Sequence, residues 1–264
     1  MQDFTLQQGD LPLLVSMPHI GTAIPDAIKA RMTPAALQLA DTDWHLPQAY
    51  GDLQALGVSC LQAHWSRYVV DLNRPPEDSN LYPGQDTTGL CPLDTFHKEA
   101  LYLPDQAPDS AEVEARRERY WRPYHAALQA ELARLQAKHG YALLWDAHSI
   151  ASEVPRFFAG RLPDLNFGNG AGSACAEGML QAVQQAAAAS QYSQVSNGRF
   201  KGGYITRHYG QPAQRVHALQ LEMAQIIYMD EQPPFALRPE RVAQLQPLLQ
   251  QLLQSALNWA RAHA

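Results

Sequence analysis

Short apolar runs alternate along the chain with longer segments whose apolar residues recur at helical spacing. The runs with the length of buried strands are Leu11–Met17, Val58–His64, Ser66–Leu72, Tyr141–Trp145 and His217–Leu221. Strands that alternate with helices favour a sheet with helices on both faces. The pattern therefore predicts an α/β fold with a mixed, mostly parallel sheet flanked by helices.

Longer segments have the apolar spacing of helices that pack against such a sheet. One begins after Asp109, which has Glu112 in the position of an N3 partner, and Gly140 is a suitable stop. Pro123 falls inside this segment and should kink or split the helix. The other predicted helices are Ser173–Ala189 and Arg241–Ala262.

Length and composition fit one domain with a substantial core. The chain has 264 residues, and 46% of them are hydrophobic. We expect a single domain over residues 1–264, present as a monomer or a small homo-oligomer. The proline-rich stretch 73–109 lacks periodicity and is too long for a simple connection, so we expect it to form a wall or lid of a site.

Charge and cysteine content exclude several classes of protein. The formal net charge is −6 and no basic run occurs, so we expect no nucleic-acid partner. The apolar runs are far shorter than the roughly 20 residues of a membrane span, and the N-terminus lacks the features of a signal peptide. The 3 cysteines are widely spaced and form no C-x-x-C pair. We therefore expect a cytoplasmic protein with no membrane partner.

Histidines and a carboxylate follow two of the apolar runs directly. In open α/β sheets, ligands bind beyond the carboxyl ends of the strands. His19 follows the first run, and Asp146 and His148 follow the run that ends at Trp145 and point to the same side. Asp146 is suited either to bind a metal or to hydrogen-bond the imidazole of His148. Each residue alone is also typical of a structural strand end, but two similar endings favour a shared site.

A carboxylate ligand is expected from the segment Asp41-Thr42-Asp43-Trp44-His45. A hydrolytic zinc site typically takes two nitrogen ligands and one carboxylate and leaves a position for water. We select Asp43 to complete the set with His19 and His148. Asp41, His45 and Asp146 stay open as alternatives, and the aspartates before the next helix also have the positions of N-caps.

A glutamate and several arginines complete the candidate site. A glutamate at the end of an apolar strand is costly unless it is paired or functional, so Glu222 is a candidate general base. Its structural alternative is an ion pair with an arginine such as Arg207 or Arg215. Arginine binds carboxylates in a bidentate manner, which makes Arg67 and Arg74 candidates for binding an acidic substrate.

Two further segments supply candidates for the substrate site. Asn73 stands next to Arg74, and Tyr204 and Arg207 stand in a segment that begins with Gly202-Gly203. Glycines at such a position indicate a loop that approaches a ligand closely. The structural alternative for any one of these arginines is a surface ion pair.

An ordered set of motifs resembles the N-formylglutamate amidohydrolases. The motifs are Pro18-His19, Asp41-Thr42-Asp43-Trp44, Arg67-Tyr68-Val69-Val70-Asp71-Leu72-Asn73-Arg74-Pro75, Pro123-Tyr124-His125, Asp146-Ala147-His148-Ser149, Gly202-Gly203-Tyr204-Ile205-Thr206 and Gln220-Leu221-Glu222. The resemblance extends from about residue 10 to about residue 230. It implies a fold similar to zinc-dependent exopeptidases, and hydrolysis of N-formyl-L-glutamate to formate and L-glutamate in histidine degradation.

The resemblance also implies roles for individual residues. Two histidines and a carboxylate bind zinc, an Asn-Arg pair binds the substrate carboxylate, and a late glutamate is the base. His19, Asn73-Arg74, His148 and Glu222 match this set. The chain departs from the His-x-x-Glu pair of carboxypeptidases, because Thr22 stands where the glutamate would be. The carboxylate ligand must therefore come from elsewhere in the chain.

Together these observations give one hypothesis for the mechanism. His19, Asp43 and His148 hold Zn²⁺, although other divalent transition metals also suit these ligands. Glu222 is the base, and Arg67 helps to stabilise the oxyanion. Asn73 and Arg74 bind one carboxylate of a small acidic substrate, and Arg207 binds the other.

Three alternatives stay open at this point. The first is a metal-free amidase in which Cys91 is the nucleophile and His97 its partner. The second is a non-catalytic protein that binds acidic amino acids on the same scaffold. The third is a hydrolase of another N-acyl acidic amino acid, because formyl and slightly larger acyl groups differ only in the pocket volume that they need.

Overall fold

The computed structural model describes residues 2–81 and 83–263. Within this part of the chain, 7 strands form one sheet in the order β1-β3-β2-β4-β7-β5-β6. They are β1 (Phe4–Gln7), β2 (Leu13–Met17), β3 (Ser59–Ala63), β4 (Ala142–Ile150), β5 (Leu165–Gly168), β6 (Gln194–Ser196) and β7 (Val216–Ala224). β3, β2, β4 and β7 are parallel neighbours, whereas β1 pairs antiparallel with β3 and β5 with β7. The predicted mixed, mostly parallel sheet is confirmed.

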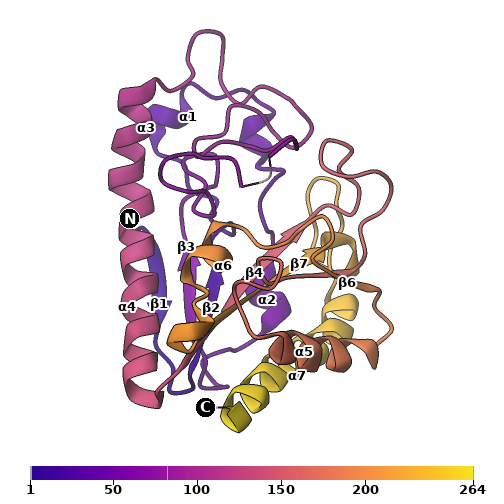
Figure 1. Ribbon diagram of the computed structural model, residues 1–264. Helices are drawn as coiled ribbons and strands as arrows, with labels where there is room; N and C mark the ends of the chain where they lie inside the picture. Colours follow the sequence, from indigo (N-terminus) through magenta and orange to yellow (C-terminus); the bar gives the residue numbers. More distant parts are fainter. Residues whose placement is uncertain (1, 82, 264) are drawn as a thin grey trace.

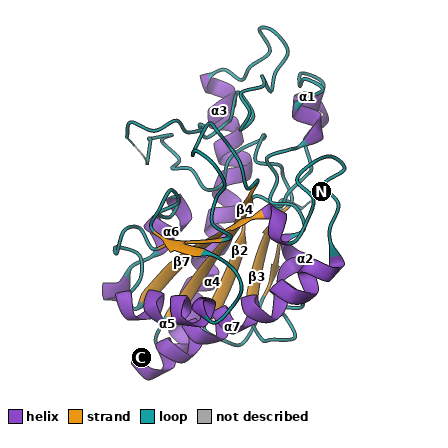
Figure 2. Ribbon diagram, turned by 90° about the vertical axis from the view of Figure 1, so that its right-hand side faces the viewer, coloured by secondary structure: helices purple, strands orange, loops and turns teal. Residues whose placement is uncertain are grey.

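Helices cover both faces of the sheet, and the long loops gather at one end of it (Figures 1 and 2). The α-helices are α1 (Asp26–Lys29), α2 (Leu46–Tyr50), α3 (Ser110–Arg116), α4 (Arg122–His139), α5 (Glu177–Ala188), α6 (Tyr204–Tyr209) and α7 (Pro239–His263). The short helical turns are η1 (Ala36–Gln38), η2 (Arg117–Trp121), η3 (Pro212–Gln214) and η4 (Gln225–Ile227). α4 and α6 pack on one face, and α2, α5 and α7 on the other. Within the described ranges, no helix has both the length and the apolar character to cross a membrane.

The two central strands β4 and β7 contribute apolar core residues along one face. Along the other face, their residues change from apolar to polar. Alternate residues of a strand point to opposite faces. On the face of α5 and α7 the core residues are Leu143, Trp145, Ala147, Leu219, Leu221 and Met223. On the face of α4 the apolar residues end halfway, and polar residues follow: Asp146, His148, Gln220 and Glu222. A polar site is thereby fixed at the carboxyl ends of these parallel strands.

Most of the predicted strands match β2, β3, β4 and β7. β4 and β7 continue to Ile150 and Ala224, further than predicted, because the polar residues of the site lie within the strands. β1, β5 and β6 were not predicted. They are 4, 4 and 3 residues long, and such short segments give little periodic signal.

The prediction of a strand over Ser66–Leu72 is wrong. This segment is a turn in which the N–H of Val69 donates to the carbonyl of Ser66. Arg67 and Asp71 form an ion pair across the turn, with 2.7 Å between Nη2 and Oδ2. Val69 and Val70 are buried in two different apolar clusters, so the apolar run reflects burial on two sides and not a strand.

The helix predicted after Asp109 is confirmed as α3, the π-helical turn η2 and α4. Asp109 Oδ1 accepts the N–H of Glu112 at 2.8 Å, as the spacing predicts. Pro123 does not split the segment, because it stands at the start of α4 directly after the π-helical turn. A proline has no N–H to donate, and a wider turn changes the hydrogen-bond pattern at this point.

The other two predicted helices are found with adjusted ends. α5 begins later than predicted, because Ser173 still belongs to a turn in which its N–H donates to the carbonyl of Gly170. α7 extends slightly beyond the predicted segment at both ends. Its buried face includes Leu245, Leu249, Leu252 and Ala256.

A core substitution tests the central position of β4. Leu144 has no exposed surface, so Leu144→Ala should lower the free energy of unfolding by about 2–5 kcal/mol through lost burial and a cavity. Leu37 is 42% exposed, and Leu37→Ala should change it by less than about 1 kcal/mol. Urea denaturation followed by circular dichroism measures both changes, and equal losses would contradict the described core.

Candidate functional site

The three predicted metal ligands lie together beyond β2 and on β4. The Nδ1 atoms of His19 and His148 lie 3.8 and 3.1 Å from Oδ2 of Asp43. One ligand atom from each residue lies within 4.8 Å of the others, and all three residues are buried. Two imidazole nitrogens and a carboxylate oxygen form a donor set typical of catalytic zinc sites. These residues therefore fit a divalent metal ion.

Further carboxylates contact both imidazoles from the opposite side. Asp71 Oδ1 lies 2.7 Å from Nε2 of His19, and Asp146 Oδ1 lies 3.0 Å from Nε2 of His148. When a metal ion is bound, an Nε2–H that donates to a carboxylate leaves the lone pair of Nδ1 for the ion. Of the two roles considered for Asp146, the geometry favours the hydrogen bond to the His148 ring.

Several buried acidic groups surround these imidazoles, and their charge also favours a cation. Asp43, Asp71 and Asp146 are each at most 1% exposed. Burial disfavours the charged ring of His148, but Asp146 and Asp43 raise its pKa well above the usual value. Burial, with the nearby Arg67, lowers the pKa of His19. A divalent ion among these groups would offset negative charge that is otherwise costly to bury.

Backbone contacts fix the turn that carries Asp43. The N–H of Asp43 donates to the carbonyl of His19 at 3.0 Å. The side chain of Gln225, just after β7, donates to the carbonyl of Thr42 at 2.9 Å. The turn is thus attached to the ends of two strands, which brings a distant carboxylate to the two histidines.

The alternative ligands Asp41 and His45 make other contacts. Asp41 Oδ2 accepts the N–H of Phe96 at 2.9 Å, and burial raises the pKa of Asp41 to about 6. His45 Nε2 lies 2.7 Å from the carbonyl oxygen of Phe235. The geometry therefore favours Asp43 over both.

Glu222 lies next to His148, because the register of β4 and β7 pairs these two residues. Nε2 of Gln220 donates to Glu222 Oε2 at 3.1 Å, and Oε1 of Gln220 accepts the N–H of Gly203 at 2.7 Å. Burial raises the pKa of Glu222 to about 8. A buried carboxyl with one fixed oxygen, beside a candidate metal cluster, has the position of a general base.

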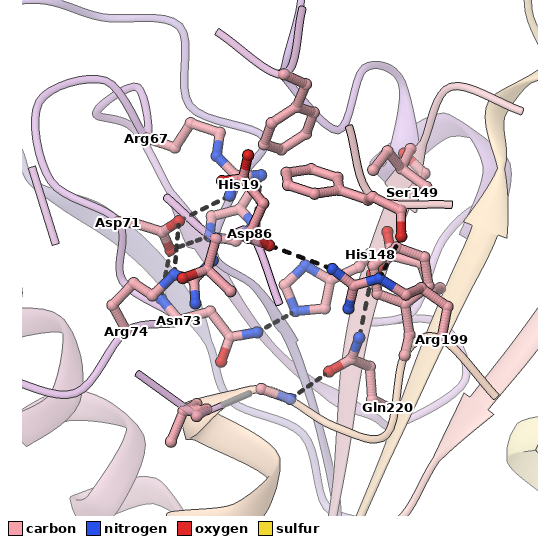
Figure 3. A pocket seen from close by; sticks show the side chains of 18 residues that line it. His19, Arg67, Asp71, Asn73, Arg74, Asp86, His148, Ser149, Arg199 and Gln220 are labelled. Carbon is pink, nitrogen blue, oxygen red and sulfur yellow. Dashed lines mark hydrogen bonds and ion pairs between the residues drawn. The ribbon is translucent and has the colours of Figure 1, made fainter. Parts of the chain in front are cut away.

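An open cavity lies beside this cluster (Figure 3). The predicted site residues that line it are His19, Arg67, Asn73, Arg74, His148 and Glu222. Tyr204 and Arg207 are not among the residues described as lining it. Tyr204 stacks on His208 along α6, and Nε of Arg207 donates to the carbonyl of Gly202 at 2.7 Å. The structure thus brings most of the predicted site together but leaves these two side chains outside the cavity wall.

The side chain of Asn73 is engaged within the protein. Nδ2 lies 2.9 Å from Nε2 of His148, and Oδ1 accepts the N–H of Ile205 at 2.8 Å. The glycine pair before α6 makes this approach feasible, because a Cβ on Gly203 would lie 2.4 Å from Nδ2 of Asn73. The close approach predicted from the glycines is therefore to a protein side chain.

The two predicted arginines next to the cluster differ in their contacts. Nη1 of Arg67 lies 3.3 Å from Nδ1 of His19, and its guanidinium lies 4.6 Å from the ring centroid of Phe96. Nε of Arg74 lies 3.8 Å from Oδ2 of Asp71. Arg67 thus stands beside the imidazole, and Arg74 stands on the other side of Asp71, where it also faces the cavity.

The sequence analysis missed the roles of Asp71 and His125. Both stand in motifs that carried the resemblance, which was the available signal. His125 Nε2 lies 2.8 Å from the carbonyl of Leu72, and Nδ1 lies 2.9 Å from the hydroxyl of Tyr209. Burial lowers the pKa of His125 to about 3. A neutral His125 thus links α4 and α6 to the turn that carries Asp71.

The alternative nucleophile Cys91 does not line the described cavity. Its thiol lies 3.6 Å from the carbonyl of Val69, and burial raises its pKa to about 11. A thiol with a raised pKa is a poor nucleophile because little thiolate is present at neutral pH. The structure therefore argues against the cysteine mechanism.

Removing the charge of Asp71, which contacts Nε2 of His19, tests the metal site without measuring activity. Asp71→Asn keeps the size of the side chain but weakens its hold on the imidazole, so Zn²⁺ affinity should fall about 10–100-fold. Competition with a chromophoric chelator measures it. The control is Asp52→Asn, because Asp52 is exposed and caps the N–H of Ala55. Unchanged affinity in Asp71→Asn would contradict the described cluster.

Comparison with known proteins identifies the family of this chain. A sequence model of the N-formylglutamate amidohydrolase family matches residues 11–229. The chain is 50% identical to an N-formylglutamate deformylase of Pseudomonas aeruginosa over 258 residues, which are 97% of each chain. It is 49% identical to an N-formylglutamate deformylase of Pseudomonas putida, over 97% of this chain and 96% of that one.

Solved structures show the same fold. A crystal structure of N-formylglutamate amidohydrolase from Ralstonia eutropha is 26% identical and superposes with a TM-score of 0.85 over 100% of both chains. A gene product of Agrobacterium tumefaciens is 18% identical, with a TM-score of 0.71 over 97% of this chain and 95% of that one. The extent of the family match and the identity to these relatives show that the chain belongs to the N-formylglutamate amidohydrolase family.

Proposed function

We propose that this protein is a metal-dependent hydrolase that converts N-formyl-L-glutamate to formate and L-glutamate. The observation that carries the proposal is the cluster of His19, Asp43 and His148 beside Glu222, in a cavity that is also lined by arginines. The names of the relatives support the choice of substrate. We further propose that the reaction serves histidine degradation, as the family resemblance implies.

The proposed metal is Zn²⁺, held by the Nδ1 atoms of His19 and His148 and by Asp43. When bound, such an ion polarises a carbonyl group and makes water acidic enough to supply hydroxide near neutral pH. Asp71 and Asp146 keep both imidazoles in the tautomer that this binding needs. Manganese, iron and cobalt also suit the ligands.

Glu222 is the proposed base and acid. It accepts a proton from the attacking water as the oxygen bonds to the formyl carbon, and it returns this proton to the amide nitrogen as the C–N bond breaks. The products are formate and the free amine of L-glutamate. A nearby divalent cation would favour the carboxylate form of Glu222, which burial alone disfavours.

The arginines are suited to the negative charges of the substrate. Arg67 stands beside His19, where it can stabilise the negative charge that develops on the formyl oxygen. Arg74 lines the cavity beyond Asp71, where its guanidinium can bind a carboxylate of the substrate. A non-catalytic binding protein would need these arginines but would not need a buried glutamate beside the candidate metal ligands.

Metal removal tests the proposal directly. The purified protein should hydrolyse N-formyl-L-glutamate, lose this activity on chelation and regain it when Zn²⁺ is added back. A coupled assay for released formate measures the rate. N-acetyl-L-glutamate, as a second substrate, tests the alternative acyl group. Full activity in metal-free protein would contradict the proposal, and glutamate binding without turnover would favour the binding-protein alternative.

Substitution of the base tests the proton transfer. Glu222→Gln should lower kcat about 10²–10⁴-fold, because proton transfer by a positioned carboxylate is lost, and should keep the bound metal. Cys91→Ala should leave kcat close to the wild-type value, because the thiol takes no part. Glu114→Gln is a matched control, since Glu114 is 53% exposed on α3. Near-normal kcat in Glu222→Gln would exclude Glu222 as the base.

A further inference from the structure

The cavity wall contains another arginine, which the sequence analysis did not single out. Arg199 lies in the segment between β6 and α6, and it lines the cavity together with Arg67 and Arg74. Figure 3 shows Arg199 on the other side of His148 from Arg74. The two arginines Arg74 and Arg199 therefore face the cavity from opposite sides.

Carbonyl groups and aromatic rings contact the guanidinium of Arg199. Nε donates to the carbonyl of Phe157 at 2.7 Å, and Nη2 donates to the carbonyl of Asp86 at 3.5 Å. The guanidinium carbon lies 5.4 and 5.5 Å from the ring centroids of Phe157 and Phe200. Contacts with carbonyl oxygens and aromatic rings orient a guanidinium without removing its positive charge.

Two carboxylates of the cavity wall are paired with other cations. Asp86 forms ion pairs with Lys98 at 2.9 Å and with Arg156 at 3.0 Å, and these partners lower its pKa to about 2. Asp71 is bound by Arg67 at 2.7 Å. These two acidic groups of the cavity wall therefore have cationic partners, and Arg199 lines the same cavity.

The proposed substrate has two carboxylates at different distances from the bond that breaks. The α-carboxylate is attached to the carbon that carries the amide nitrogen, whereas the γ-carboxylate lies at the end of the side chain. Arg74 directly follows Asn73, whose amide is 2.9 Å from the His148 ring. Arg199 is anchored to two other loops of the cavity wall, through Phe157 and Asp86.

We infer that Arg74 binds the α-carboxylate and Arg199 the γ-carboxylate, which makes Arg199 the residue that selects an acidic side chain. This inference rests on the proposed function and replaces Arg207, which the described cavity wall does not include. The γ-carboxylate is remote from the reacting carbon, so its contact is equally strong in the ground state and in the transition state. Arg199 should therefore affect KM and leave kcat nearly unchanged.

The test compares N-formyl-L-glutamate with its neutral γ-amide, N-formyl-L-glutamine. In Arg199→Gln, KM for N-formyl-L-glutamate should rise roughly 10–100-fold, the range expected for a lost charge-assisted hydrogen bond. KM for the γ-amide should stay within about threefold, so the preference for the acid disappears. Arg199→Lys should retain part of the preference for the acid, because lysine keeps the charge but not the bidentate geometry.

Two further variants show whether the effect is specific. Arg161 is 56% exposed and pairs with Asp164, so Arg161→Gln should leave both KM values unchanged. Arg74→Gln should weaken the binding of both substrates, because both carry the α-carboxylate. Circular dichroism and the metal content of each variant exclude misfolding as the cause.

Different outcomes separate the two proposals. The role of Arg199 is contradicted if the wild type is active and Arg199→Gln changes KM for both substrates equally, or for neither. The role of Arg199 is also contradicted if Arg207→Gln, and not Arg199→Gln, loses the preference for N-formyl-L-glutamate over its γ-amide. A wild type that does not hydrolyse N-formyl-L-glutamate contradicts the proposed function instead. In that case, calorimetric binding of glutarate to the Zn²⁺-loaded protein tests Arg199 alone, and unchanged affinity in Arg199→Gln would contradict its role.

Discussion

The site depends on two buried imidazoles that are each held by a buried carboxylate. Asp71 and Asp146 hold the Nε2 atoms of His19 and His148, and the Nδ1 atoms of both rings face Asp43. A buried carboxylate is costly unless its oxygens find partners. Asp146 accepts the hydroxyl of Thr206 at 2.9 Å. The surrounding helix and turn thus contribute partners to these two pairs.

The sheet and the loops contribute different side chains to the site. β4 and β7 pack apolar residues against α4 along their first halves and then present Asp146, His148 and Glu222 along the same face. The loops that begin at Arg67 and at Arg199 bring guanidinium groups to the cavity wall. The proposed dianionic substrate would meet these local cations in the cavity, although the net charge of the chain is −6.

Several features of the fold and site could be predicted from the sequence because they depend on local pattern. Apolar runs of strand length located β2, β3, β4 and β7, and helical spacing located the segment from Asp109 to Gly140 and the helix α7. Strand alternation placed Asp146 and His148 on one side, and the position after a strand singled out His19 and Glu222. The order of motifs identified the family, which the relatives confirm.

Only the tertiary structure decided the rest, because the deciding contacts join residues far apart in the chain. The sequence left Asp41, Asp43 and Asp146 as alternative carboxylate ligands, and the attachment of one turn to His19 and Gln225 distinguishes them. The run Ser66–Leu72 has strand composition, yet burial between two clusters and the Arg67–Asp71 pair make it a turn. Arg199 has no local signal, since its place in the cavity is set by carbonyl groups from two other loops. Periodicity determines which face of an element a residue occupies, and long-range packing determines what that residue meets.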